Sequence, residues 1–233
     1  KGDLGTSLRT KRPVLTEVQG RYMNTVQLTL LSLTWSVIAG VLIGVWSGRN
    51  RSKWQDYTGM TVAVSGISMP SFWIGFMLIM VFAVKYRLLP TTGAGSFKNL
   101  ILPSITLGVS IAAIIARFTR SSVIEVLKED YVRTARAKGL REKTVIWKHV
   151  FRNCMISVVT VVGLQFGFLL GGSVVTETVF AFPGLGSLLI ESVNYRDYPA
   201  IQSLILIFSL HFVLINLVVD VLYAVLNPEI QLS

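Results

Sequence analysis

The sequence predicts an all-α polytopic membrane protein, and three observations lead to this fold class. Apolar residues make up 52% of the 233 residues and charged residues only 15%, against about 25% charged in a typical soluble domain. The mean hydropathy is +0.61. Five apolar stretches, most of about 20 residues or more, are long enough to cross roughly 30 Å of hydrocarbon as helices. A small soluble enzyme is therefore excluded.

Polar or charged breaks separate the five predicted spans, which are expected at residues 25–47, 57–84, 100–116, 153–179 and 200–226. In the second span, Pro70 removes a backbone donor in mid-helix, which predicts a kink there.

Two spans carry a glycine every four residues. These are Gly40, Gly44 and Gly48 in the first span, and Gly163, Gly167 and Gly171 in the fourth. Such stripes favour close helix packing in lipid. Glycine is also simply common in membrane spans, and this interpretation stays open.

The distribution of charge orients the chain in the membrane. Loops 48–56 and 117–152 carry thirteen Lys and Arg residues, against nine on the opposite side, which places these two loops in the cytoplasm. The sequence thus predicts an extracytoplasmic segment at 1–24, one transmembrane domain at 25–226 and a cytoplasmic tail at 227–233. Within the domain, residues 117–152 form a cytoplasmic hairpin and residues 180–199 an outer cap.

Several functions lack a basis in the sequence. The net charge of +10 would suggest nucleic acid binding in a soluble protein, but here it follows from membrane orientation, and no nucleic acid partner is expected. Cys154 is the single cysteine, and no Cys/His cluster indicates a metal site. The chain opens on Lys1 with a polar start and no signal peptide, so we expect a missing N-terminal piece.

Loop 117–152 reads as a basic amphipathic hairpin. Val123, Leu127, Tyr131 and Ala135 form one apolar ridge at helical spacing, and Gly139 can end that helix in a left-handed conformation. One interpretation is a solvated loop that also touches anionic lipid. The other is a docking element for a cytoplasmic partner.

Three motifs resemble one family of transporters. The run DYVRTARAKGL at 130–140 closely resembles the cytoplasmic signature of ABC importer permeases of the dipeptide, oligopeptide, glutathione and nickel branch. The runs TETVFAFPGLGSLLIESVNYRDYPAIQ at 176–202 and NPEI at 227–230 are also similar to that branch. The resemblance implies a type I ABC importer permease bundle in the bacterial inner membrane, with a sixth span N-terminal to the five predicted here.

The resemblance also implies a function and a set of partners. The chain would be the permease subunit of an ATP-driven importer of di- or oligopeptides, with glutathione among the candidates, working by alternating access. Its partners would be a second, homologous permease subunit in a heterodimer, two ATP-binding subunits, an extracytoplasmic solute-binding protein and membrane lipid. No GxxxxGK[ST] motif exists in the chain, so ATP and Mg²⁺ belong to the partner subunits and this chain is not an enzyme.

Within the signature, the resemblance implies a short helix that sits in a cleft of the ATP-binding subunit. The residues expected to couple the two subunits are Asp130, Tyr131, Val132, Arg133, Ala135, Arg136, Lys138 and Gly139. In this interpretation Tyr131 and Val132 supply apolar anchoring, and the three basic side chains pair with groups at the cleft rim.

Candidates for the substrate path are the few polar groups inside spans, because a charge in hydrocarbon costs at least about 2.5 kcal/mol. Glu177 could contact a peptide amine or, in a nickel importer, a cation, but the favoured interpretation is an interfacial carboxylate. His211 could line the path or pack through hydrogen bonds, and Gln165 is a similar case. Two other functions stay open at this point: an importer of nickel or another metal chelate, and a secondary transporter that works alone.

Overall fold

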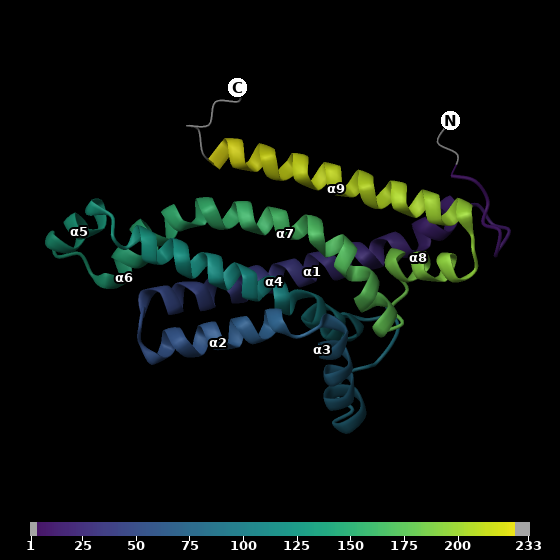
Figure 1. Cartoon of the computed structure of the whole chain (residues 1–233), viewed down its shortest axis with the longest axis horizontal. Coiled ribbons are helices and arrows are strands. Elements are labelled where there is room, and N and C mark those ends of the chain that lie inside the picture. The colour runs from purple at the N-terminus through teal and green to yellow at the C-terminus, as the bar shows by residue number, and fades with distance from the viewer. Residues whose placement is uncertain (1–3, 227–233) are drawn as a thin grey trace. The chain divides into compact units, whose positions relative to one another are not determined.

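The computed structural model describes residues 4–226, apart from some side chains inside two long helices, and this part of the chain is helical, with no strand. The predicted all-α fold class is confirmed. Residues 1–3 and the predicted tail at 227–233 lie outside the described residues. Figure 1 shows the elements in chain order. They are α1 (Val14–Arg49), α2 (Trp54–Ser68), α3 (Ser71–Leu78), the π-helical η1 (Ile79–Lys85), α4 (Phe97–Val126), α5 (Asp130–Ala137), α6 (Glu142–Thr144), the π-helical η2 (Val145–Val150), α7 (Phe151–Val179), α8 (Leu185–Asn194) and α9 (Tyr198–Leu226).

The helices that can span a membrane are consistent with the five predicted spans. By length and composition, α1, α4 and residues Tyr198–Val219 of α9 can each cross a membrane alone. Two bent pairs pass the same test together: α2 with α3 and η1, and Glu142–Met155 with Val158–Leu169. If each bent pair is one span, the described chain has up to five spans.

The second predicted span is broken rather than kinked. Helix α2 ends at Ser68, and α3 begins at Ser71 after Pro70, whose φ of −59° and ψ of 135° are not helical. Proline has no backbone N–H and disfavours the helical conformation at the preceding residue, so the helix stops instead of bending. The carbonyl of Pro70 then accepts the first bonds of α3.

Two compact units divide the chain. One consists of residues 1–34, 69–108 and 166–215, and the other of residues 35–68, 109–165 and 216–233. The division runs through four helices, each of which has one part in each unit: α1, α4, α7 and α9.

The first unit has its core where α1, α8 and α9 meet. The buried side chains of this core are Val14, Val18, Leu185, Leu188, Ala200 and Leu204. The apolar pattern LGSLL at the start of α8 therefore buries one face against α1 and α9. This packing fixes the position of the segment that the sequence predicts as an outer cap.

The second unit is held by a close approach of α1 and α4. A Cβ atom added at Gly40 or Gly44 would lie 2.7 Å from a backbone oxygen of α4, so only glycine permits this spacing. The glycine stripe predicted for the first span is confirmed. In α7, by contrast, Gly171 has open space around it, and the stripe predicted there is not continuous. Helix α2 runs back beside the second half of α1 (Figure 1).

Candidate coupling helix and substrate path

The hairpin predicted at 117–152 is built differently from the sequence expectation. Helix α4 continues to Val126, ten residues past the predicted end of its span, and α5 starts anew at Asp130. The apolar ridge predicted from Val123 to Ala135 is thus split between two helices. Gly139 adopts a φ of +75° and ends the hairpin's first arm, as predicted. Beyond it, α6 and η2 lead without a gap into α7.

The inner face of α5 packs on its own hairpin. Val132 is fully buried and Ala135 is 6% exposed, and α5 contacts η2. On η2, Val145 and Val150 are also fully buried. Val132 and Ala135 are therefore turned into the protein, and the structure does not expose Val132 as an apolar anchor.

The outer face of α5 is polar and accessible. Arg133 and Asp130 form an exposed pair at 3.3 Å. Lys138 is exposed beside Gly139. Tyr131 is 40% exposed, and its hydroxyl accepts a hydrogen bond of 2.6 Å from the side-chain amide of Asn153. This face presents two cations and one aromatic ring at the surface of the hairpin.

Arg136 closes the turn at Gly139. Its guanidinium donates two hydrogen bonds to the carboxylate of Glu142, at 2.8 Å and 3.2 Å. The hydrogen bond to this carboxylate raises the pKa of Arg136 above its ordinary value. Arg136 thus stiffens the hairpin in this structure, and Glu142 is a residue of the site that the sequence analysis did not single out. Opposite charges six residues apart across a glycine could have indicated the pair.

Glu177 lies in the other unit, fully buried at the end of α7. The hydroxyl of Thr25 donates to its carboxylate at 2.8 Å, and the backbone N–H of Ser187 donates at 3.0 Å. The Thr25 hydroxyl also accepts from the N–H of Leu185 at 2.8 Å. One carboxyl group therefore joins α7, α1 and the N-terminus of α8, where the helix dipole favours an anion. Gly184 leaves room for the carboxylate, because a Cβ there would overlap it.

His211 is bonded to the same stretch of α1. Its Nδ1 lies 2.8 Å from the carbonyl oxygen of Ile207, which can only accept, so Nδ1 carries the proton. Its Nε2 shares a hydrogen bond of 2.5 Å with the Tyr22 hydroxyl. Tyr22 and Thr25 are three residues apart on α1, and the sequence analysis missed both as partners of its candidates. Gln165 is half-buried in α7 and belongs to the other unit.

The cap segment is bound to the start of the chain through two carboxylates. Asp197 accepts hydrogen bonds from the Ser7 hydroxyl and from the backbone N–H of Leu8 at 3.0 Å. Burial alone would raise the pKa of Asp197, but these hydrogen bonds outweigh it and hold the pKa below its ordinary value. Residues 4–13, called the N-terminal segment below, thereby lie against the junction of α8 and α9.

Glu191 on α8 pairs with two arginines. Arg21 approaches its carboxylate at 3.0 Å and Arg9 at 3.2 Å. Burial alone would raise the pKa of Glu191, whereas the hydrogen bonds and charges of the two arginines lower it below the ordinary value. The Arg9 guanidinium also lies 5.3 Å from the centre of the Tyr195 ring. No group of three or more His, Cys, Asp or Glu side chains placed to share a metal ion was found among the described residues.

The sequence matches the family described as binding-protein-dependent transport system inner membrane component over residues 40–232. The chain belongs to this family. The permease is 57% identical over 231 residues to a glutathione transport system permease protein GsiC of Escherichia coli O6:H1, a match that covers 99% of the permease and 76% of that relative. It is 56% identical, with the same coverage, to the GsiC protein of Pectobacterium atrosepticum.

A solved structure supports the fold of the permease. An inward-facing form of the MetNI methionine ABC transporter aligns with a TM-score of 0.79 at 17% sequence identity, covering 91% of the permease and 97% of that chain. The family, the relatives and this fold identify an ABC importer permease of the peptide and glutathione branch in the bacterial inner membrane. Such a permease is a transport component and not an enzyme, and it works with ATPase and binding-protein subunits that supply ATP hydrolysis and solute capture.

Proposed function

We propose that the permease moves small peptides, with glutathione as the first candidate, into the cytoplasm by alternating access. The observation that carries the proposal is the identity of 57% over 99% of the chain to proteins named as glutathione transport permeases. In the proposed assembly, a second homologous permease pairs with this chain, two ATP-binding subunits hold ATP and Mg²⁺, and an extracytoplasmic binding protein delivers the solute. The nickel and stand-alone transporter alternatives have no comparable observation in their favour.

The solute is tested by uptake into proteoliposomes that contain the whole complex, ATP inside, and labelled glutathione, a labelled dipeptide or nickel outside with the binding protein. We expect glutathione or the dipeptide to accumulate, and only when ATP can be hydrolysed. Uptake of nickel alone would contradict the proposed substrate class. Uptake without the ATP-binding subunits would contradict the proposed mechanism.

The coupling proposal is that the outer face of α5 engages the ATP-binding subunit. Arg133, in the middle of α5, and Lys138, which caps its C-terminus, are both exposed and basic. The buried contacts of Val132 fix this helix to the hairpin, so force on the outer face is passed to α7 through η2. Rim ion pairs of this kind set orientation and specificity more than affinity.

Charge reversal at the outer face tests this role. The double variant Arg133→Glu/Lys138→Glu should reduce substrate-stimulated ATP hydrolysis and uptake by about tenfold or more. A loss of about 1.4 kcal/mol in the binding free energy between α5 and the ATP-binding subunit corresponds to a factor of ten. Its matched control is Arg141→Glu/Lys143→Glu, which changes the charge equally at exposed positions just outside α5. Equal loss in both variants, or full activity in the first, would refute the role of α5.

We also propose that the hairpin at 117–152 is cytoplasmic and that the cap at 180–199 lies outside. The native Cys154 is 1% exposed, so it should give little background in labelling with a membrane-impermeant thiol reagent. In right-side-out vesicles, the variant Arg196→Cys should be labelled and Lys138→Cys should not. The reverse pattern would invert the proposed orientation.

A further inference from the structure

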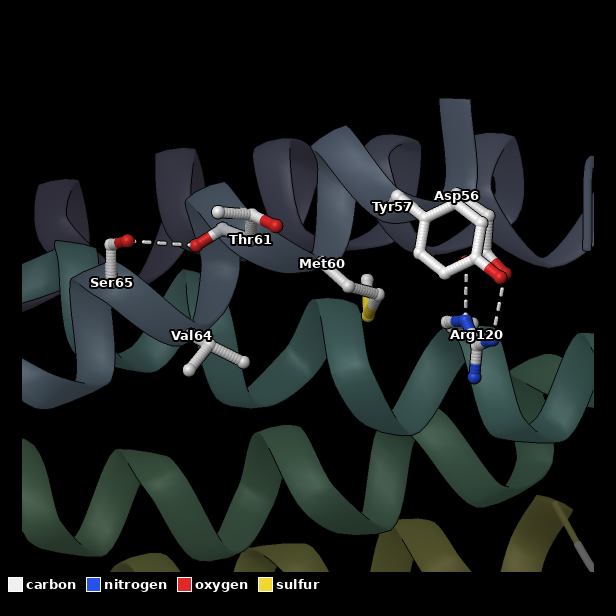
Figure 2. A pocket seen from close by; sticks show the side chains of 7 residues that line it. All are labelled: Asp56, Tyr57, Met60, Thr61, Val64, Ser65 and Arg120. Carbon is white, nitrogen blue, oxygen red and sulfur yellow. Dashed lines mark hydrogen bonds and ion pairs between the residues drawn. The ribbon is translucent and has the colours of Figure 1, made fainter. Parts of the chain in front are cut away.

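Two grooves in the second unit meet at Arg120. The first, of about 340 Å³, runs along α2 beside Tyr57, Met60 and Val64 and is closed at one end by Arg120 of α4 (Figure 2). The second, of about 410 Å³, lies on the other side of Arg120, next to Arg51 and Lys128. Both volumes fall in the range of about 300–1,000 Å³ that is typical of small-molecule sites.

Arg120 separates the two grooves, and its side chain is held in place because its charge is neutralised by Asp56. Its Nε lies 2.5 Å from one oxygen of Asp56, and a second guanidinium nitrogen lies 2.7 Å from the other (Figure 2). Asp56 is 3% exposed and also accepts from the backbone N–H of Ser52 at 3.0 Å. Such a bidentate, partly buried pair keeps both side chains in place. Arg120 therefore shapes the grooves without adding net charge to them.

The second groove carries excess positive charge. Arg51, at the turn before α2, and Lys128, just after the end of α4, are both exposed and form no ion pair within the part of the chain that the structure describes. Glu125 is the one carboxylate among the residues that line this groove. The other lining residues are neutral or basic. Two uncommitted cations against one anion favour a ligand with negative charge.

The first groove is mainly apolar and suits a hydrocarbon chain. Met60 and Val64 line it on α2, and the Ser65 hydroxyl there is already satisfied by the carbonyl of Thr61 at 2.8 Å. A groove that offers methyl groups and few free polar groups does not select a water-soluble anion. It does offer van der Waals contact to an acyl chain.

Aromatic rings mark the level of the membrane surface beside the grooves. Trp46 of α1 and Trp54 of α2 meet edge to face, with ring centres 6.1 Å apart, and their exposed fractions are 44% and 67%. Exposed Trp residues at helix ends gather at the boundary between head groups and hydrocarbon. Arg51 lies three residues before Trp54, at head-group level, whereas Val64 lies deeper along α2.

We propose that the two grooves form one binding site for an anionic glycerophospholipid. The phosphate group lies between Arg51 and Lys128, and one acyl chain lies along α2 over Met60 and Val64. The basic groove lies at head-group level and matches the phosphate, and the apolar groove lies deeper and matches the acyl chain, as in a lipid of the bilayer. A free phosphate ion would leave the apolar groove unused, and a zwitterionic lipid would gain less from the excess charge.

Native mass spectrometry of the assembled transporter tests the site. The protein is reconstituted in nanodiscs of phosphatidylcholine with increasing phosphatidylglycerol, and the bound lipid is identified after release from the disc. We expect phosphatidylglycerol to be retained in preference to phosphatidylcholine. The variant Arg51→Gln/Lys128→Gln should weaken phosphatidylglycerol binding by about fivefold for each basic residue removed. The variant Val64→Trp should displace the lipid by filling the apolar groove.

The matched control removes the same charge elsewhere on this unit, at Lys53 and Lys143, which line neither groove. Lys53→Gln/Lys143→Gln should retain phosphatidylglycerol like the unmodified protein. A photoactivatable phosphatidylglycerol should cross-link to peptides of α2 and of the end of α4. Equal retention of both lipids by the unmodified protein, equal loss in the control, or cross-links from these residues to the second permease instead of lipid would overturn the proposal.

Discussion

Removal of the Glu177 carboxyl group should destabilise the permease more than any nearby polar change. The variant Glu177→Ala removes a fully buried carboxylate and leaves the buried Thr25 hydroxyl and the partly buried Ser187 N–H without their acceptor. Each buried donor left unpaired costs about 1–3 kcal/mol, which gives about 2–6 kcal/mol in total. The variant Glu177→Gln keeps one acceptor oxygen but turns an amide donor toward the second N–H, so we expect about half of that loss.

Thermal unfolding of the purified transporter measures the series. For a chain of this size, about 1 kcal/mol corresponds to a shift of roughly 2–4 °C, so the alanine variant should melt roughly 4–24 °C lower. The control is Thr178→Ala, one residue further along α7, where the hydroxyl is exposed and bonds only the carbonyl of Val174. The reasoning is supported if Thr178→Ala is the most stable of the three variants, Glu177→Gln is intermediate and Glu177→Ala is the least stable. An alanine variant as stable as the control would refute it.

Two further predictions concern helix packing and pH. The Gly20→Ala exchange in α1 should stabilise the protein by about 0.5–1 kcal/mol, since nothing lies within 4 Å of the added Cβ. Gly44→Ala should destabilise it by about 1–3 kcal/mol, because the added Cβ meets the Ala116 carbonyl. Shifts of the melting temperature in the same direction for both variants would contradict the close approach of α1 and α4. The lowered pKa of Asp197 means that its bonds to the N-terminal segment are present above its ordinary pKa near 3.9 and are lost as the pH falls further through the lower folded value. Hydrogen exchange at Leu8, corrected for the intrinsic pH effect, should show this loss of protection, and Asp197→Asn should remove its pH dependence; an unchanged profile in that variant would exclude Asp197 as the cause.

The helices could be predicted from the sequence because a membrane span depends mainly on local composition. A long apolar run has to satisfy its backbone hydrogen bonds internally, and only a helix does this within one segment. The left-handed turn at Gly139 was predictable for a similar reason, since a glycine after a polar helical run is a local signal. The contact of Gly40 and Gly44 with α4 followed from a spacing of four residues, although the sequence did not say which helix they meet.

What the sequence could not give are the partners of polar groups far apart in the chain. Thr25 and Glu177 are 152 residues apart, and no pattern in either segment indicates that they meet. The same holds for Asp56 and Arg120, which the sequence placed in two separate polar loops. The break at Pro70 is a different case, because proline predicts both a kink and a stop, and the surrounding packing decides between them.

The structure also changes the physical interpretation of the signature in α5. Its pattern predicts a surface for docking, with Val132 as an apolar anchor for a partner. In the structure Val132 is fully buried against the same chain, while the charged residues face outward. A helix that transmits force needs two kinds of contact: a firm one to its own hairpin, which burial of apolar side chains provides, and a reversible one to the moving partner, which exposed charges provide. In the proposed coupling role, the eight-residue amphipathic helix α5 supplies both, because its apolar and its charged residues lie on opposite faces.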